Sequence, residues 1–589
     1  MRPAIQLRTQ SSLTRPLGLA ALCFLIGLGL VVWFGNIALR TLTEPDEARY
    51  AEIAREMLAT GDWVTPHLNG IAYFEKPPLQ YWATAVAYSV FGAQPWVARL
   101  WTTGFGLLGL VLTYATAKKL WGVRTAEHAA LLLASFPLYF IVTHLNLLDG
   151  ALAFFLNAAV CAFVVAKQPD TPLLARRRLL YLCWFALALG FLQKGLVALV
   201  LPFLALTTYS LLYRDSRLWR EMQLRAGLAI LAAVTLPWTT LVASRNPGFL
   251  EFFFVHEQFT RFLTTVHDRY QPWWYFIAVL IAGVSPWLVV AVRTTIHAVR
   301  RRATLTTSPQ AERLLLIWAI VQLTFFSLSD SKLAPYVLPM TVPMALLMAR
   351  WLDLYGTMRT LNSVAVTITV LLLLLIASPW LLPHLVVPGL KLTTYLQVAE
   401  WAQYGGFAGL ACMALYVLVA RGGDLRPPVT ALAASVSLAL AIFMCGANAL
   451  DHSRGQANLA AVIAPHLAAD APLFCVGTYW QALPFDLKRT CIVVEYRGEF
   501  ELQFDPNQRN HLAGVREFVE RWKHEPGAVA LVTAELWPQI ANSGIEARTV
   551  MHDDNVVVLV APDPCSARNT RSRSKRETSD SPLLSQLSR

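Results

Sequence analysis

The chain has 589 residues, of which 56% are hydrophobic and only 15% are charged. A soluble domain carries about 25% charged residues, so this composition excludes an ordinary soluble protein. Apolar runs of about 18 to 22 residues recur along the chain and predict a polytopic α-helical membrane protein. The net charge of +12 then indicates a positive-inside distribution of Lys and Arg rather than a nucleic-acid partner.

The apolar runs predict about thirteen membrane spans. The first lacks a cleavage site of the A-x-A type, so we interpret it as a retained helix. The predicted spans are 17–39, 96–118, 127–144, 148–166, 179–193, 195–213, 224–243, 273–294, 312–327, 333–351, 362–382, 403–420 and 429–449. With the N-terminus inside, Lys and Arg collect in the cytoplasmic loops, as at 118–124 and 176–178. The segment 43–82 and everything after residue 450 then lie on the external side of the membrane, opposite the cytoplasm.

Three parts are predicted along the chain. Residues 1–450 form the transmembrane domain, with loop helices outside the membrane over 40–95. Residues 451–565 form a small external α/β domain. The last stretch, 566–589, is rich in Ser and Arg and is predicted to be disordered.

The prediction of an α/β domain depends on short apolar runs that are typical of buried strands. These runs are 473–477, 490–496, 528–536 and 555–561. His511 to His524 is predicted to form a helix between two of them. The first strand is not followed by a glycine-rich loop, so we expect no nucleotide site. Cys475 and Cys491 could pair in an oxidising compartment, although no spacing rule demands it.

Ionisable side chains gather at the outer ends of the predicted spans. Placing such groups at the edge of a bilayer is costly, which favours a functional role. If the helices form a bundle, these groups converge on one cavity that opens outward. They are Asp46, Glu75, Lys76, Asp149, Lys194, His256, Asp330 and Lys332.

The segment that follows the first span is predicted to begin a helix. Pro45 suits the first turn of that helix, and Glu44, Asp46 and Glu47 suit its positive end. Asp46, Arg49 and Tyr50 then share one face. Asp46 is either a residue of the site or a helix-capping group that pairs with Arg49.

Lysines at a membrane surface attract phosphate. Lys76 and Lys194 could hold a lipid phosphate as point charges, with Tyr336 adding a hydrogen bond. Alternatively, Lys76 is a snorkelling residue that contacts lipid headgroups. His256 is a metal ligand, a phosphate contact or a packed interfacial residue, and with Glu75 it could bind a divalent cation such as zinc.

Four motifs together resemble one family. TEPDEARYAEIAREMLATGDWVTPHLNG, YFEKPPLQYW, the HEQFTRFL…QPWWYF segment and SKLAPYVLP are similar to those of the ArnT-type aminoarabinose transferases of Gram-negative inner membranes. These enzymes are GT-C glycosyltransferases related to the protein O-mannosyltransferases. The resemblance covers nearly the whole chain. Among these motifs, FEKP together with SKLxxYxLP is the most specific.

The resemblance implies a function and a site. It implies inverting transfer of 4-amino-4-deoxy-L-arabinose from undecaprenyl phosphate to a lipid A phosphate, which modifies lipopolysaccharide and confers polymyxin resistance. The active site faces the periplasm, and no cofactor is expected beyond a metal at Glu75 and His256. The protein is expected to be a monomer that contacts membrane lipids and no nucleic acid. The implied catalytic residues are Asp46 and Asp149, and the implied substrate-binding residues are Arg49, Tyr50, Tyr73, Lys76, Lys194 and Tyr336.

Two alternatives stay open at this point. A related transferase of the same architecture could use another polyprenyl-phosphate sugar or another acceptor, such as a core saccharide or a protein hydroxyl. A lipid transporter or flippase would carry ionisable residues near the midplane of broken helices. Here those residues lie at the outer ends of spans, which favours a transferase.

Overall fold

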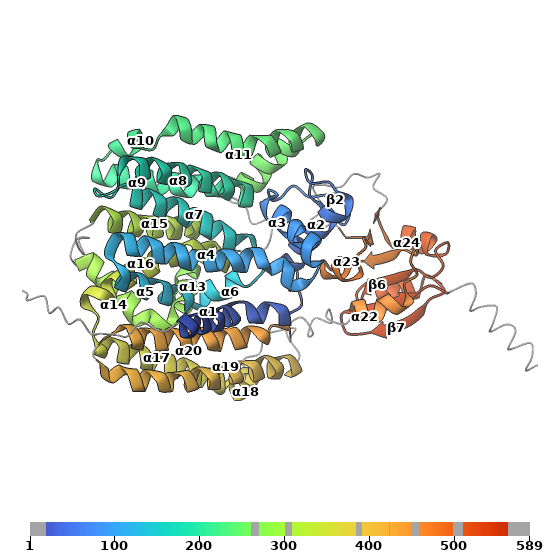
Figure 1. Ribbon diagram of the computed structural model, residues 1–589. Helices are drawn as coiled ribbons and strands as arrows, with labels where there is room; N and C mark the ends of the chain where they lie inside the picture. The colour runs from blue at the N-terminus through green and yellow to red at the C-terminus, as the bar shows by residue number, and fades with distance from the viewer. Residues whose placement is uncertain are drawn as a thin grey trace, which may run out of the picture.

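The computed structural model describes residues 19–260, 270–300, 309–384, 392–422, 424–448, 459–496, 498 and 510–562. Figure 1 shows the long helices side by side in one bundle, with the C-terminal α/β domain beyond one end of it. Between the two lie α2 (Asp46–Thr60), α3 (Leu79–Phe91) and a hairpin of β1 (His67–Leu68) and β2 (Ile71–Ala72). The predicted polytopic fold with a separate α/β sheet is therefore confirmed.

The bundle consists of long apolar helices joined by short helical turns. The main helices, some of them short halves of bent pairs, are α1 (Leu19–Phe34), α4 (Pro95–Trp121), α5 (Val123–Ala134), α6 (Pro137–Thr143), α7 (Leu148–Ala166), α8 (Leu173–Lys194), α9 (Val197–Tyr213), α11 (Leu224–Arg245), α13 (Tyr275–Gly283), α14 (Leu288–Arg300), α15 (Pro309–Leu328), α16 (Thr341–Tyr355), α17 (Met358–Ile376), α19 (Leu392–Val419) and α20 (Arg426–Cys445). The turns include η1 (Gly35–Leu39), α10 (Arg217–Glu221), the π-helix η2 (Glu251–Thr260), η3 (Ser285–Trp287), η4 (Ala334–Met340) and α18 (Ser378–Leu381).

Helices coincide with each of the predicted spans, but fewer of them qualify as complete membrane crossings. Within the described residues, eight helices are long and apolar enough, or ten if each of two bent pairs is one span. The bends are 65° between α5 and α6 and 78° between α13 and η3–α14. Pro137 and Pro286 lie at these breaks, where a proline cannot continue the preceding helix. The estimate of about thirteen spans also counts helices outside this set, among them the shorter apolar helices Gly27–Leu39 and Val197–Tyr213.

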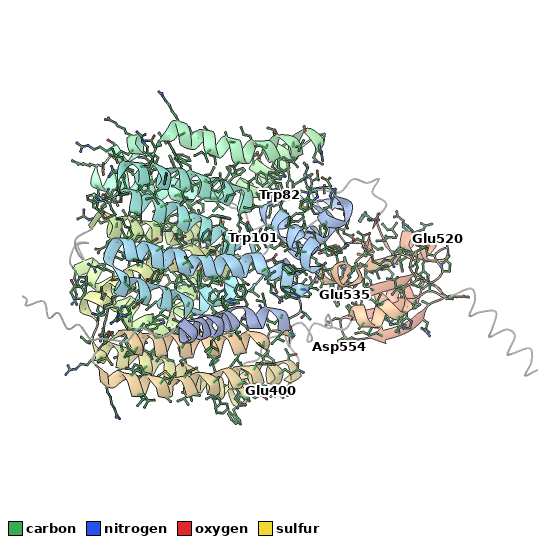
Figure 2. The ribbon with its side chains drawn as sticks, viewed as in Figure 1. Trp82, Trp101, Glu400, Glu520, Glu535 and Asp554 are labelled. Atoms are coloured by element: carbon green, nitrogen blue, oxygen red, sulfur yellow. The ribbon has the colours of Figure 1, made fainter. Side chains whose placement is uncertain are left out.

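The end of the bundle that faces the α/β domain has the side chains of a membrane–water boundary. Trp82 of α3 and Trp101 of α4 lie near this end, whereas Glu520 and Glu535 lie on the α/β domain (Figure 2). The Trp82 indole donates a hydrogen bond to the carbonyl of Trp63, 2.7 Å away. Tryptophan prefers such interfaces because its ring is apolar and its N–H is polar.

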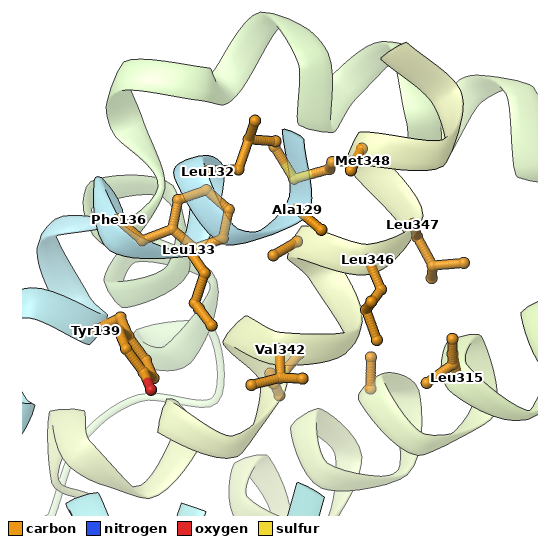
Figure 3. Packing of buried hydrophobic residues seen from close by; sticks show 14 of the residues in the cluster. Ala129, Leu132, Leu133, Phe136, Tyr139, Leu315, Val342, Leu346, Leu347 and Met348 are labelled. Carbon is orange, nitrogen blue, oxygen red and sulfur yellow. The ribbon is translucent and has the colours of Figure 1, made fainter. Parts of the chain in front are cut away.

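The centre of the bundle is closely packed apolar side chains. Figure 3 shows Leu132, Leu133 and Phe136 around α5 against Val342 and Leu346 of α16. All five are buried. Burial of side chains of this kind contributes about 1.5–3 kcal/mol each, which explains why helices distant in sequence hold fixed positions.

The C-terminal domain is a mixed six-stranded sheet in the order β5–β4–β3–β6–β8–β7. The neighbouring pairs β5–β4, β4–β3 and β3–β6 are parallel. The pairs β6–β8 and β8–β7 are antiparallel. The strands are β3 (Leu473–Val476), β4 (Ile492–Val494), β5 (His511–Leu512), β6 (Val529–Thr533), β7 (Arg548–His552) and β8 (Val556–Val560). The helices beside them are α22 (Leu459–Ile463), α23 (Ala482–Leu487), α24 (Val515–Trp522) and α25 (Trp537–Ala541).

The sequence located four of these strands and missed two. The helix predicted over His511–His524 was wrong at its start, because His511 and Leu512 add to the edge of the sheet as β5. β7 was missed because it is the other edge strand and has no fully buried residue, unlike the continuous apolar runs of central strands. The predicted domain boundary at 450 and the predicted disordered tail at 566–589 lie outside the described residues.

One hydrophobic core joins the α/β domain to the loop helices. Leu68 and Ile71 of the hairpin belong to the same buried cluster as Val493 and Leu531 of the sheet. Cys475 and Cys491 lie in this cluster as free thiols, so no disulfide joins them. The α/β domain therefore packs directly on the elements that carry the charged loop segment.

Candidate functional site

A cavity of about 460 Å³ opens where α7 begins and α8 ends, beside the start of α2. Its wall combines charged and apolar side chains. The polar lining residues are Asp46, Arg49, Tyr50, Glu75, Lys76, Asp149, Lys194, Glu257, Ser329, Ser331 and Tyr336. The apolar lining includes Leu152, Leu156, Val197, Leu201, Phe325 and Phe326. Such a wall suits an amphiphile whose polar head and apolar tail are both held.

Helix α2 supplies the first group of site residues. Asp46 begins the helix, and Arg49 and Tyr50 follow one turn later, so all three face the cavity. Arg49 Nη1 lies 3.6 Å from the Asp46 carboxylate, so the ion pair of the capping alternative is present. Both residues nevertheless line the cavity, and Asp46 keeps 30% of its side chain exposed. Pairing with Arg49 and contact with a ligand are therefore compatible.

Helices α7 and α8 supply a second group. Asp149 lies in the first turn of α7 and Lys194 ends α8, and their side chains are 2.6 Å apart. Lys194 Nζ also lies 4.8 Å from the centre of the Tyr336 ring, which comes from η4. An ammonium over an aromatic face is attracted to it, so the lysine is held between a carboxylate and a ring. Tyr336 thus orients Lys194.

The third group surrounds Lys76. Its ammonium donates to the Glu257 carboxylate at 2.7 Å and to the backbone carbonyl of Glu75 at 2.9 Å. The Glu75 carboxylate lies 4.0 Å from the same ammonium. All three residues are buried. A buried lysine between two carboxylates is held firmly, which argues against a side chain that snorkels into lipid.

Four of the predicted residues do not line the cavity: His256, Tyr73, Asp330 and Lys332. His256 stacks on Phe252, with the ring centroids 5.3 Å apart, while the neighbouring Glu257 faces the cavity. The reason is the phase of η2: Phe253 and Glu257 form its buried side, and Phe249, just before the helix, is buried with them. Tyr73 is buried, and its hydroxyl has no hydrogen-bond partner among the described residues. Burial raises the pKa of Tyr73 well above its usual range, so this residue is neutral.

The predicted metal site at Glu75 and His256 has no group of three or more ligands among the described residues. In the part of the chain that the structure describes, no group of three or more His, Cys, Asp or Glu side chains could hold a metal ion. The position between Glu75 and Glu257 belongs to the Lys76 ammonium. The predicted metal at Glu75 and His256 stays a prediction.

Sequence reasoning missed the buried ion pair beneath the site. Glu47 was expected to suit the positive end of α2, but its carboxylate faces inward and accepts two hydrogen bonds from Arg99 of α4, each 2.8 Å. It also accepts from the backbone N–H of Asn146 at 2.7 Å. Burial alone would raise the pKa of Glu47, but the charge and hydrogen bonds of Arg99 outweigh burial and lower it to about 2. Glu47 thus ties α2 to the bundle.

This pair predicts a dependence of stability on pH. The folded-state pKa of Glu47, about 2, lies below its ordinary value of 4.5, so the unfolded chain binds the proton more readily. The stabilisation is fully present above pH about 4.5 and is lost as the pH falls towards about 2. We expect the unfolding temperature of the solubilised protein to fall over this range, and to fall less in Glu47→Gln. Equal acid sensitivity of the two proteins would contradict the assignment.

The fold and the site define a class: an integral membrane protein with a cavity of charged and apolar side chains where its helix bundle meets the loop helices. Comparison with known proteins narrows this class. The family model described as dolichyl-phosphate-mannose-protein mannosyltransferase matches residues 19–253. The model of the aminoarabinose transferase C-terminal domain matches residues 459–561.

Relatives with curated names cover most of the chain. The undecaprenyl phosphate-alpha-4-amino-4-deoxy-L-arabinose arabinosyl transferase of Erwinia tasmaniensis is 31% identical over 517 residues, which are 84% of this chain and 90% of the relative. The Pseudomonas aeruginosa protein of the same name is 37% identical over 351 residues, and the match spans 61% of that relative's length. The crystal structure of ArnT from Cupriavidus metallidurans bound to undecaprenyl phosphate is 31% identical, with a TM-score of 0.85 over 92% of this chain and 98% of that chain.

The chain belongs to the family of undecaprenyl phosphate-alpha-4-amino-4-deoxy-L-arabinose arabinosyl transferases, and it is a glycosyltransferase. The family resemblance stated from the sequence is confirmed.

Proposed function

We propose that this protein transfers 4-amino-4-deoxy-L-arabinose from undecaprenyl phosphate to a phosphate of lipid A, with inversion at the anomeric carbon. It works as a monomer in the bacterial inner membrane, with its cavity on the periplasmic side. The modified lipopolysaccharide binds polymyxin and other cationic peptides less well. The names of the relatives and the undecaprenyl phosphate in the similar ArnT structure support the donor.

The observation that carries the proposal is the composition of the cavity wall. A polyprenyl-phosphate sugar has a charged head and a long apolar tail. The cavity offers the cations Lys76, Lys194 and Arg49 together with leucine, valine and phenylalanine side chains. The cations attract the phosphate, and the apolar wall accepts the tail.

The charge balance of the cavity favours a sugar that carries an amine. Its lining holds three basic side chains, Arg49, Lys76 and Lys194, and four acidic ones, so the net charge is −1. The acids are Asp46, Glu75, Asp149 and Glu257. The phosphates of the donor and the acceptor add further negative charge, and a neutral sugar would offset none of it. The ammonium of an amino sugar offsets one unit of this negative charge.

The reaction needs no net proton transfer. An oxygen of the acceptor phosphate attacks the anomeric carbon, and the bond from that carbon to the undecaprenyl phosphate oxygen breaks. A phosphate monoester becomes a diester, while the donor diester becomes a monoester, so the charges balance. Monoester phosphates have a second pKa near 6 and are already largely dianionic at neutral pH. The protein therefore contributes positioning and charge stabilisation rather than a strong base.

The geometry divides these tasks among the site residues. Lys76 and Lys194 stabilise the negative charge that grows on the departing phosphate. Asp46 and Asp149 bind the sugar's ammonium or hydroxyls and stabilise the positive charge that develops at the anomeric carbon. Arg49 lies against Asp46 and shields the anionic nucleophile from that carboxylate.

Substitution of Asp46 by asparagine tests the need for its charge. We expect Asp46→Asn to lower the rate of transfer about tenfold or more, because one stabilising charge is lost near the reacting carbon. The measurement is transfer by purified protein at equal protein concentration. Full activity of Asp46→Asn would show that transfer does not need the Asp46 charge and that Asp46 only begins the helix.

The cellular test is mass spectrometry of lipid A. The host is a strain that makes the undecaprenyl-linked donor but lacks its own transferase. We expect expression of this protein to add one aminopentose per modified phosphate. An unchanged spectrum would contradict the proposed function, and a different sugar or a modified core saccharide would favour another acceptor or donor.

A further inference from the structure

One side chain of the α/β domain, that of Gln481, contacts a residue of the cavity. Gln481 directly precedes α23 and is only 2% exposed. Its Oε1 atom accepts a hydrogen bond from Arg49 Nε at 2.9 Å. We propose that Gln481 is a positioning residue of the transferase: through it, the C-terminal domain sets the orientation of the Arg49 guanidinium. This inference rests on the function proposed above.

The residue next to Gln481 holds the chain just before α2. The backbone N–H of Ala482 donates to the carboxylate of Glu44. Residues 481 and 482 therefore contact Arg49 in the first turn of α2 and Glu44 just before that turn. The start of α2 and its arginine are thus held by the same short segment of the α/β domain.

A neutral partner suits the task of Arg49. Arginine has a long, flexible side chain, and its planar guanidinium recognises phosphate only when its plane is fixed. Its contacts include a hydrogen bond from Nε to Gln481 and the approach of Nη1 to Asp46. Because an amide carries no charge, Gln481 orients the guanidinium without neutralising it. A carboxylate at the same place would compete with the phosphate.

The domain that carries Gln481 is anchored independently of Arg49. Asn69, in the β1–β2 turn, accepts from the backbone N–H of Cys491 at 2.8 Å and donates to the carbonyl of the same residue at 2.9 Å. The buried cluster that links the hairpin to the sheet adds to this anchor. Gln481 is therefore presented to Arg49 from a docked domain.

The test compares Gln481→Leu with Asn69→Gly in the purified full-length protein. Leucine keeps the approximate volume but removes the acceptor. Glycine at 69 removes the docking bonds and tolerates the left-handed backbone there, where φ is 56°. We expect Gln481→Leu to raise the KM for the donor about tenfold and to weaken undecaprenyl phosphate binding similarly, because an oriented bond to a charged group is lost. Asn69→Gly is expected to lower the unfolding temperature without changing that KM.

A double-mutant cycle separates an effect through Arg49 from a general structural one. In an Arg49→Lys background the Nε donor is absent, so Gln481→Leu is expected to add no further loss of undecaprenyl phosphate affinity. Additive losses, or a wild-type KM and affinity in Gln481→Leu, would overturn the inference. So would an equal rise in KM in Asn69→Gly. If the wild-type protein transfers no aminopentose, the proposed function fails, while the undecaprenyl phosphate affinities still decide the role of Gln481.

Discussion

Substitution of Lys76 by methionine is expected to lower kcat/KM for transfer by a factor of about 10² to 10³. Lys76 is buried at the cavity with its ammonium held by Glu257 and by the Glu75 carbonyl. A cation fixed in this way stabilises the departing phosphate without reorganising as the bond breaks. Methionine preserves the length of the side chain and removes the charge. The measurement is the rate of transfer from undecaprenyl-linked aminoarabinose by the purified protein.

Two controls distinguish lost chemistry from lost folding. Lys76→Met removes the lysine partner of the buried Glu257 carboxylate, which destabilises the fold by itself. The double variant Lys76→Met/Glu257→Gln removes that carboxylate charge too, and we expect it to regain stability but not activity. Lys332→Met is the matched lysine control, because Lys332 is buried, bonds to the Gln271 carbonyl and does not line the cavity. Wild-type activity in Lys76→Met, or equal losses in Lys332→Met, would contradict the assignment.

Substitution of Glu47 by glutamine is expected to destabilise the protein by about 3–5 kcal/mol, the usual cost of leaving one member of a buried ion pair without its partner. Arg99 is fully buried and makes two of its hydrogen bonds to Glu47. Glutamine keeps the shape but cannot balance the guanidinium charge. The measurement is the free energy of unfolding, or the unfolding temperature, of the solubilised protein at neutral pH.

The matched control is an exposed carboxylate that also pairs with a basic residue. Glu520 of α24 bonds to Lys523 at 2.8 Å on the surface of the α/β domain. We expect Glu520→Gln to leave the unfolding temperature unchanged, because solvent screens exposed pairs. An unfolding temperature of Glu47→Gln equal to that of the wild-type protein would show that the Glu47–Arg99 pair does not hold α2 in place.

The sequence located the membrane helices and much of the cavity for physical reasons. Long apolar runs mark helices in a membrane, and charge at their outer ends is costly enough to indicate a site. Asp149 and Lys194 were placed in one cavity on that ground, and the structure brings them within 2.6 Å. Lys76 and Arg49 line the same cavity.

Three site residues could not be predicted, because their partners depend on helix phase and on tertiary contacts that the sequence pattern does not show. The phase of the π-helix decides that Glu257, rather than His256, faces Lys76. Glu47 carries the same charge as the exposed acids beside it, and only the position of Arg99 turns it inward. Gln481 lies in another domain, and no spacing relates it to Arg49. The apolar periodicity of Phe249 and Phe253 is the signal that could have located Glu257.

Transfer between defined lipids by the purified protein tests the central claim most directly. The donor is undecaprenyl phosphate linked to labelled 4-amino-4-deoxy-L-arabinose, and the acceptors are lipid A and lipid A whose phosphates have been removed enzymatically. The proposed function predicts labelled sugar on intact lipid A, release of undecaprenyl phosphate in equal amount, and no label on the dephosphorylated acceptor. Equal labelling of both acceptors, or no labelling of either, would contradict it.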